Sequence, residues 1–295
     1  MAIDASGEAI AIWETRENES FIQSVSRPPG GTWSRPVDIS KRKAGALSPK
    51  IAIDPRGGAV AVWFAGSGET VQGAERPSGG TWSQPTNLSR RRHEAGFPRL
   101  AVNTDGEAVV VWSDRKGRSF GAIQSVSRPA GGEWSNIQNL ATAPGSRRST
   151  LAYSEPEVAL DVAGEAVVVW ERYLSDKDAV IQSAMRSPGG TWSKPTEISG
   201  KGNVGQSFVG IDADGDAVAV WVVVTGNDKN PPLTVQGATR PSGAAWSDPA
   251  DISAKAQEPV QAKVVVNPAG KAVAVWRKAT KRFVIQSVSR RLDGD

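Results

Sequence analysis

The sequence predicts an all-β fold: a six-bladed β-propeller of four-stranded antiparallel blades, the sixth blade lacking its outer strand. A unit of about fifty residues, the usual length of a propeller blade, recurs six times along the 295-residue chain. Each unit divides into short apolar or alternating segments separated by turn-forming residues. All eleven tryptophans occupy one of two fixed places in the unit. Together these observations favour radially stacked four-stranded sheets.

We expect a single domain covering residues 1–295. Its approximate blades are 1–40, 41–89, 90–140, 141–199, 200–253 and 254–295. Strands of about five residues are not stable in an isolated small sheet, so the sheets must stack face to face. A pair of β-sandwiches or a solenoid is the competing architecture, and neither explains such a regular order of turns.

The first two strands of each unit, such as 50–54 and 58–63, are expected to form a hairpin. Asp54 opens the turn between them, and Gly57 supplies the positive φ that the turn requires. An Asp or Asn stands at this position in every unit: Asp4, Asp54, Asn103, Asp161, Asp212 and Asn267. The stretch "DADGD" at 212–216 is therefore interpreted as a turn, since it also lacks the bidentate Glu of a calcium loop.

The third strand of each of the six units carries a Gln and, four residues later, an Arg. Period two places both side chains on one face of the strand. The turn that follows carries a Trp in five units. The positions are Gln23, Arg27 and Trp33; Gln72, Arg76 and Trp82; Gln124, Arg128 and Trp134; Gln182, Arg186 and Trp192; and Gln236, Arg240 and Trp246.

Two interpretations of these repeated positions remain open. In the structural one, each Gln bridges neighbouring backbones and each Arg stacks on its Trp. In the other, each set is a sugar site. That arrangement resembles six-bladed fucose-binding lectins, in which an Arg, an acidic residue and a Trp between blades hold each sugar. No acidic residue recurs in register here, which favours the structural interpretation.

The turn before the fourth strand resembles the Asp-box, or bacterial neuraminidase repeat, of sialidase-like β-propellers. Its pattern is Ser/Thr-x-Asp-x-Gly-x-Thr-Trp, and Ser26, Gly30, Thr32 and Trp33 match it. The box is degenerate, because Pro28 stands at the Asp position and Pro or Ser replaces the Asp in the other units. The resemblance covers nearly the whole chain. It implies a sialidase-like propeller whose boxes lie on the face away from the substrate.

The loops on the opposite face vary in length and content, which is usual for binding loops on a regular scaffold. Several are basic, and they supply the candidate ligand-binding residues Arg42, Arg91, Arg92, Arg147 and Arg172. Arginine suits carboxylate and phosphate groups. The expected function is thus a noncatalytic binding or scaffold propeller that recognises glycans or acidic surface polymers. The alternative for these loops is that they only keep the protein soluble.

A sialidase-like glycoside hydrolase is the alternative function. The family resemblance implies an arginine cluster, a Tyr nucleophile paired with a Glu, and an Asp acid/base. Tyr173 and Glu171, which follow the second strand of the fourth unit, are the candidate catalytic residues. A second enzyme class would pair the carboxylates of Glu14 and Glu171, provided that they lie within about 5 to 9.5 Å of each other.

Composition excludes several kinds of site. The chain has no cysteine and one histidine, His93, so disulfides, thiolate catalysis and multi-His metal sites are excluded. No metal or cofactor is expected. The sequence has no apolar run long enough for a membrane span and no export signal of its own. Nucleic acid is not expected as a partner, because the basic runs contain no interleaved aromatics. We expect a monomer that is part of a longer secreted or cell-surface protein.

Overall fold

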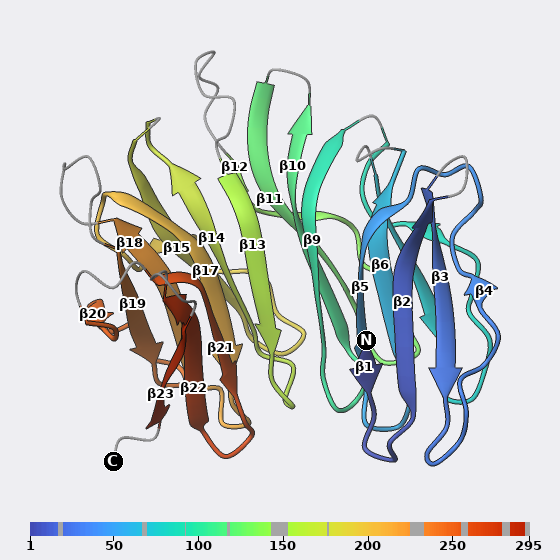
Figure 1. Cartoon of the computed structure of the whole chain (residues 1–295). Helices are drawn as coiled ribbons and strands as arrows, with labels where there is room; N and C mark the ends of the chain where they lie inside the picture. Colours follow the sequence, from blue (N-terminus) through green and yellow to red (C-terminus); the bar gives the residue numbers. More distant parts are fainter. Residues whose placement is uncertain are drawn as a thin grey trace. The chain divides into compact units, whose positions relative to one another are not determined.

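The computed structural model describes residues 1–16, 20–66, 70–91, 93–116, 119–142, 153–175, 177–224, 233–254, 259–278 and 284–292. The chain forms two compact units, residues 1–145 and 146–295, and each is described by itself. Each unit contains three antiparallel sheets, here called blades and numbered in chain order (Figure 1). Five blades have four strands, and the sixth has three among the described residues.

The first unit holds blades 1 to 3. Blade 1 contains β1 (Ala2–Ile3), β2 (Ala9–Arg16), β3 (Ser20–Arg27) and β4 (Val37–Asp38). Blade 2 contains β5 (Leu47–Ile53), β6 (Ala59–Ala65), β7 (Thr70–Arg76) and β8 (Thr86–Asn87). Blade 3 contains β9 (Glu94–Val102), β10 (Ala108–Lys116), β11 (Ser119–Arg128) and β12 (Gln138–Thr142).

The second unit holds blades 4 to 6. Blade 4 contains β13 (Tyr153–Leu160), β14 (Ala166–Tyr173), β15 (Ala179–Arg186) and β16 (Thr196–Glu197). Blade 5 contains β17 (Asn203–Ile211), β18 (Ala217–Val224), β19 (Leu233–Arg240) and β20 (Ala250–Asp251). Blade 6 contains β21 (Pro259–Val266), β22 (Lys271–Lys278) and β23 (Val284–Arg291).

The turn between the first two strands of each blade is an Asx turn. In blade 2, Asp54 Oδ1 accepts hydrogen bonds from the backbone N–H groups of Arg56 (2.7 Å) and Gly58 (3.2 Å), and Gly57 has a φ of 89°. The hairpin prediction is confirmed. In blade 5, the N–H groups of Asp214 and Asp216 bind Asp212 Oδ1 in the same way. The stretch 212–216 is therefore a turn, as predicted.

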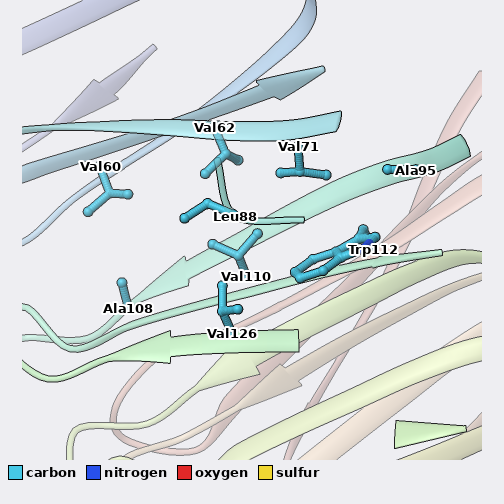
Figure 2. Close-up of a cluster of buried hydrophobic side chains, with 9 residues drawn as sticks. All are labelled: Val60, Val62, Val71, Leu88, Ala95, Ala108, Val110, Trp112 and Val126. Atoms are coloured by element: carbon cyan, nitrogen blue, oxygen red, sulfur yellow. The ribbon is translucent and has the colours of Figure 1, made fainter. Parts of the chain in front are cut away.

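Within each unit the blades stack face to face, with the first strand of one blade against the sheet of the preceding blade. Between blades 2 and 3, Val60 and Val62 of β6 belong to one buried cluster with Val110 and Trp112 of β10 (Figure 2). Trp112 is fully buried. Burial of each such side chain contributes about 1.5 to 3 kcal/mol, so these contacts fix the spacing of neighbouring blades and of the side chains at their rims.

In four blades, two serines of the outer segment extend the short fourth strand. In blade 1, Ser34 Oγ accepts the N–H of Ser26 (3.1 Å), and Ser40 Oγ accepts the N–H of Ile22 (2.8 Å). Blades 2, 4 and 5 repeat both hydrogen bonds. The hydroxyls thus accept hydrogen bonds from third-strand N–H groups that a two-residue strand does not pair with, and those of Ile22, Val71 and Val235 are buried. This explains the recurring "WS" and "IS" or "LS" pairs, a role that the sequence analysis did not assign.

Candidate functional site

The strand-borne arginines link neighbouring blades through turn carboxylates. Arg76 of blade 2 donates to Glu8 Oε1 of blade 1 over 2.8 Å, and Arg240 of blade 5 donates to Glu165 Oε1 of blade 4 over 2.7 Å. All four side chains are largely buried. Each arginine Nε also donates to a turn carbonyl of its own blade. These two arginines have no spare charge for a ligand.

Blade 2 breaks this pattern, because Gly58 occupies the turn position that Glu8 and Glu165 hold elsewhere. Arg128 of blade 3 therefore has no turn carboxylate to bind on blade 2. Its Nη1 instead donates to Glu75 Oε2 over 2.8 Å. Glu75 lies near the end of β7. The carboxylate that pairs with the arginine therefore comes from the third strand of blade 2, and not from the turn between its first two strands.

Trp134 completes a three-residue cluster with Glu75 and Arg128. The indole Nε1 donates to Glu75 Oε1 over 2.7 Å, and the Arg128 guanidinium lies 5.6 Å from the centroid of the indole ring. Glu75 has a side-chain exposure of 32% against 10% for Arg128. The cluster thus presents a solvent-reachable carboxylate beside a partly exposed aromatic ring, both held in place by the arginine.

A pocket of about 500 Å³ adjoins this cluster, which is within the usual range for small-molecule sites. Its walls are the outer segment of blade 2 and the glycine turn of blade 3. The lining residues are Glu75, Ser83, Gln84, Thr86, Asn87, Leu88, Val126, Gly131, Gly132, Glu133, Trp134 and Ser135. Hydroxyl, amide and carboxylate groups predominate, with an indole on one wall. We call this the Glu75 pocket.

Glu75 differs in charge from the residues at the same position of the other units. At the same position of the third strand, the other units have Ser26, Ser127, Met185, Thr239 and Ser289. An acidic residue stands at this position in one unit only, so it does not recur in register. Glu75 and Gly58, two deviations from the repeat in one unit, are the sequence signal of an altered contact at this blade.

The repeated glutamines bind side chains of the adjacent strands rather than backbones. In blade 1, Gln23 Nε2 donates to Asp38 Oδ1 (2.9 Å) and its Oε1 accepts from Thr15. In blades 2, 3 and 5, the equivalent residues Gln72, Gln124 and Gln236 donate to Asn87, Asn139 and Asp251. Gln182 lies opposite Glu197 in the register of blade 4. These contacts join the third and fourth strands.

Stacking of the repeated arginines on the turn tryptophans occurs in three blades. Arg27 lies 5.3 Å from the ring of Trp33, and Arg186 lies 5.6 Å from that of Trp192, in addition to the Arg128 pair. Trp33 is 44% exposed. Trp82 and Trp246, whose arginines bind turn carboxylates, are partly buried.

Tyr173 and Glu171 are brought together at the end of β14. The Tyr173 hydroxyl donates to Glu171 Oε2 over 2.8 Å. The other carboxylate oxygen accepts the N–H of Gln206, a residue of β17 with a φ of 56°. Glu171 is only 5% exposed. A tyrosine hydroxyl bound to a buried carboxylate is the arrangement by which a base would activate a phenol.

The candidate arginines of the loops have different surroundings. Arg42 Nε donates to Asp38 Oδ2 over 2.6 Å and lies 4.7 Å from the ring of Phe21. Arg172 Nη1 lies 3.4 Å from Glu197 Oε1. Arg91 is exposed. Arg92 and Arg147 lie outside the described residues.

The Asp38 carboxylate has an altered pKa. Partial burial acts to raise it, but hydrogen bonds from Arg42 and Gln23 and the Arg42 charge outweigh this effect and lower the pKa below its usual value. The ion pair therefore keeps Asp38 charged in its contact with Gln23. Arg42 is accordingly engaged within its own blade.

Within the described part of the chain, no group of three or more His, Cys, Asp and Glu side chains is placed to hold a metal ion. No helix there is long and apolar enough to cross a membrane.

Comparisons with known proteins identify the fold. No family model matches the sequence, and no curated protein matches it. Solved structures do match: an ulvan lyase (TM-score 0.60, 10% identity, 99% of this chain and 80% of that one), a Hadza microbial sialidase (0.54, 13%, 99% and 65%) and an α-L-arabinofuranosidase from Fusarium graminearum (0.53, 14%, 99% and 91%). The chain thus spans less than two thirds of the sialidase. The six sheets are the blades of a β-propeller, and the predicted fold class is confirmed.

Proposed function

We propose that this protein is a noncatalytic glycan-binding propeller whose sugar site is the Glu75 pocket. The observation that carries the proposal is the cluster of Glu75, Arg128 and Trp134 at the rim between two blades. A carboxylate, a guanidinium and an indole held together by hydrogen bonds form a rigid site that needs no rearrangement to bind.

The chemistry of the pocket suits a neutral sugar. Each Glu75 oxygen uses one lone pair for Arg128 or Trp134 and keeps another for a sugar hydroxyl. The indole offers an apolar face for ring C–H groups, and the amides of Gln84 and Asn87 also line the pocket. Glu133 adds a second acidic side chain. Because the Arg128 charge is already neutralised, an acidic sugar would meet uncompensated repulsion here.

The comparisons support a glycan ligand without naming it. The similar structures are of enzymes whose names refer to carbohydrates, and the turn glycines Gly30, Gly79 and Gly131 share a positive φ next to the tryptophans. We propose that these turns are degenerate Asp-boxes. Acidic polymers would bind instead to the basic loops, for which Arg91 is the exposed described candidate.

A glycan array of neutral, sialylated and sulfated oligosaccharides tests the proposal. Glu75→Gln is expected to abolish binding of neutral glycans, because it removes the charge that orders the cluster. Glu8→Gln is the matched control, since it breaks an equivalent inter-blade ion pair that lies away from the pocket. Equal loss in both variants, or full binding by Glu75→Gln, would rule out the pocket.

A sialidase-like hydrolase is the second candidate, favoured by the hydrogen bond between Tyr173 and Glu171. Glu171 would act as the base and Tyr173 as the nucleophile. Assay with a fluorogenic sialoside decides the matter. Turnover that Tyr173→Phe abolishes and Tyr153→Phe leaves intact would establish the enzyme and refute the noncatalytic proposal; absence of turnover in the unaltered protein would remove this candidate.

A further inference from the structure

Arg91 has in blade 2 the position that Arg42 has in blade 1. Each stands four residues after the fourth-strand residue that contacts the repeated Gln. In blade 1 that residue is Asp38, whose carboxylate accepts a hydrogen bond from Arg42 Nε over 2.6 Å. In blade 2 it is Asn87. The carboxylate that neutralises the arginine of blade 1 is therefore replaced by an uncharged amide in blade 2.

The Arg91 guanidinium contacts this amide and keeps its charge. One end of the Asn87 amide lies 2.8 Å from Gln72 Nε2, and the other end lies 3.1 Å from Arg91 Nε and 3.3 Å from its Nη2. Because an amide has no net charge, the contact positions the guanidinium without neutralising it. Arg91 and the preceding Arg90 are both exposed. Neither forms an ion pair with a residue that the structure describes.

The chain is anchored on both sides of these two arginines. Before them, Ser89 is buried and its Oγ accepts the N–H of Val71 over 2.8 Å. After them, His93 Nδ1 lies 2.9 Å from Asp114 Oδ2 of β10, and both side chains are largely buried. Anchors so close to Arg91 restrict its backbone, so less conformational entropy is lost when the side chain binds an anion.

Arg91 lies beside the Glu75 pocket, because Asn87 lines that pocket. The Glu75 carboxylate is at some distance. Asn87 is opposite Gln72 in the register of blade 2, and Glu75 follows three residues later on the same strand, a separation of about 10 Å along β7. The Debye length at physiological salt is about 8 Å, so Glu75 only weakly repels an anion bound at Arg91. The pocket thus has an acidic part and a separate basic neighbour.

We propose that Arg91 binds an anionic substituent, a sulfate or a carboxylate, of the glycan whose neutral residue occupies the Glu75 pocket. This inference rests on the proposed function and names its ligand class, an oligosaccharide in which a neutral residue adjoins an acidic one. Two of the N–H groups of the guanidinium face Asn87, and the other three are available to the anion. Their planar arrangement matches the oxygens of both kinds of substituent.

The glycan array tests this inference when it carries matched pairs that differ only in the anionic group. Lactose and sulfolactose form one such pair, and cellobiose and cellobiouronic acid form another, so the array also distinguishes sulfate from carboxylate. We expect the anionic member of a bound pair to have an affinity up to about fivefold higher at low salt, because an exposed ion pair is weak. Added sodium chloride should reduce this ratio of affinities.

Variants of the full chain assign the ratio to Arg91. Asn87→Asp supplies the carboxylate that Asp38 provides for Arg42, and blade 5 also has Asp at this position, so the substitution suits the fold. In Asn87→Asp and in Arg91→Gln, the ratio should fall to about one. Arg42→Gln is the matched control and should keep the ratio. In ¹⁵N-labelled protein, the Nε–H resonance of Arg91 should shift with the anionic member of a pair and not with the neutral one.

The outcomes separate this inference from the proposed function. Equal affinity for both members of every bound pair, or a ratio that Arg91→Gln leaves intact, would overturn the inference and leave binding of neutral glycans at the Glu75 pocket in place. Anionic binding that Arg91→Gln abolishes and Glu75→Gln leaves intact would refute the Glu75 pocket and, with it, the joint site. Absence of all glycan binding would overturn both.

Discussion

Removal of the Glu75 carboxylate should destabilise the interface between blades 2 and 3. Glu75→Ala deletes the acceptor of two hydrogen bonds, one from Arg128 and one from the Trp134 indole. A hydrogen bond to a charged group contributes about 1.5 to 3 kcal/mol, and its loss leaves the buried donor unpaired. Glu75 is about one third exposed, so water replaces part of the loss. We expect the free energy of unfolding to fall by about 2 kcal/mol.

Urea unfolding at pH 7, followed by tryptophan fluorescence, measures this change. Glu133→Ala, an exposed position on the same pocket, is the control and should change the free energy of unfolding by less than about 0.5 kcal/mol. A double-mutant cycle of Glu75→Gln with Trp134→Phe should give a coupling of about 1 kcal/mol. Zero coupling, together with equal effects of the two alanine variants, would refute the proposed cluster.

Three further results are expected. Arg240→Ala should lower the free energy of unfolding by about 3 kcal/mol, because it leaves the Glu165 carboxylate buried and unpaired; a loss below about 1 kcal/mol in urea unfolding would contradict this. Ser89→Ala should cost about 1 to 3 kcal/mol, because the buried N–H of Val71 loses its acceptor, and faster hydrogen exchange of that amide is the check. Burial raises the pKa of Asp212 in the folded protein. Ionisation of this carboxyl, at pH values above its usual pKa, therefore lowers the free energy of unfolding. The free energy of unfolding of Asp212→Asn, relative to that of the unaltered protein, should therefore rise from pH 3 to pH 7. Urea unfolding at the two pH values measures this difference, and a fall would contradict the prediction.

The repeat made the blades predictable. Asp54 and Gly57 define a turn by local chemistry alone, and the same spacing in six units fixes where each hairpin lies. Strand burial followed from continuous apolar runs such as 59–63. The fold could be predicted because each blade repeats the same local rules and stacks by the same contacts.

The candidate site could not be predicted in the same way. The Glu75 pocket depends on which arginine pairs with which carboxylate across two blades. This contact occurs once, so features shared by all six units do not predict it. The hydrogen bond between Tyr173 and Glu171 followed from their proximity on one strand. The basic loops were chosen by composition, yet Arg42 and Arg172 turn to carboxylates of their own blades. Whether a loop arginine can bind a ligand depends on the carboxylates beside it in the fold, and the position of the arginine in the sequence does not show them.

Tryptophan indole resonances offer the most direct test of glycan binding at the Glu75 pocket. The indole N–H of Trp134, assigned by its loss in Trp134→Phe, would be followed in ¹⁵N-labelled protein during titration with the neutral oligosaccharides that the array selects. Binding at the pocket predicts a saturable shift of this resonance, with little change at Trp192 and none in the Glu75→Gln protein. A bound glycan that leaves the Trp134 resonance unmoved would contradict the account.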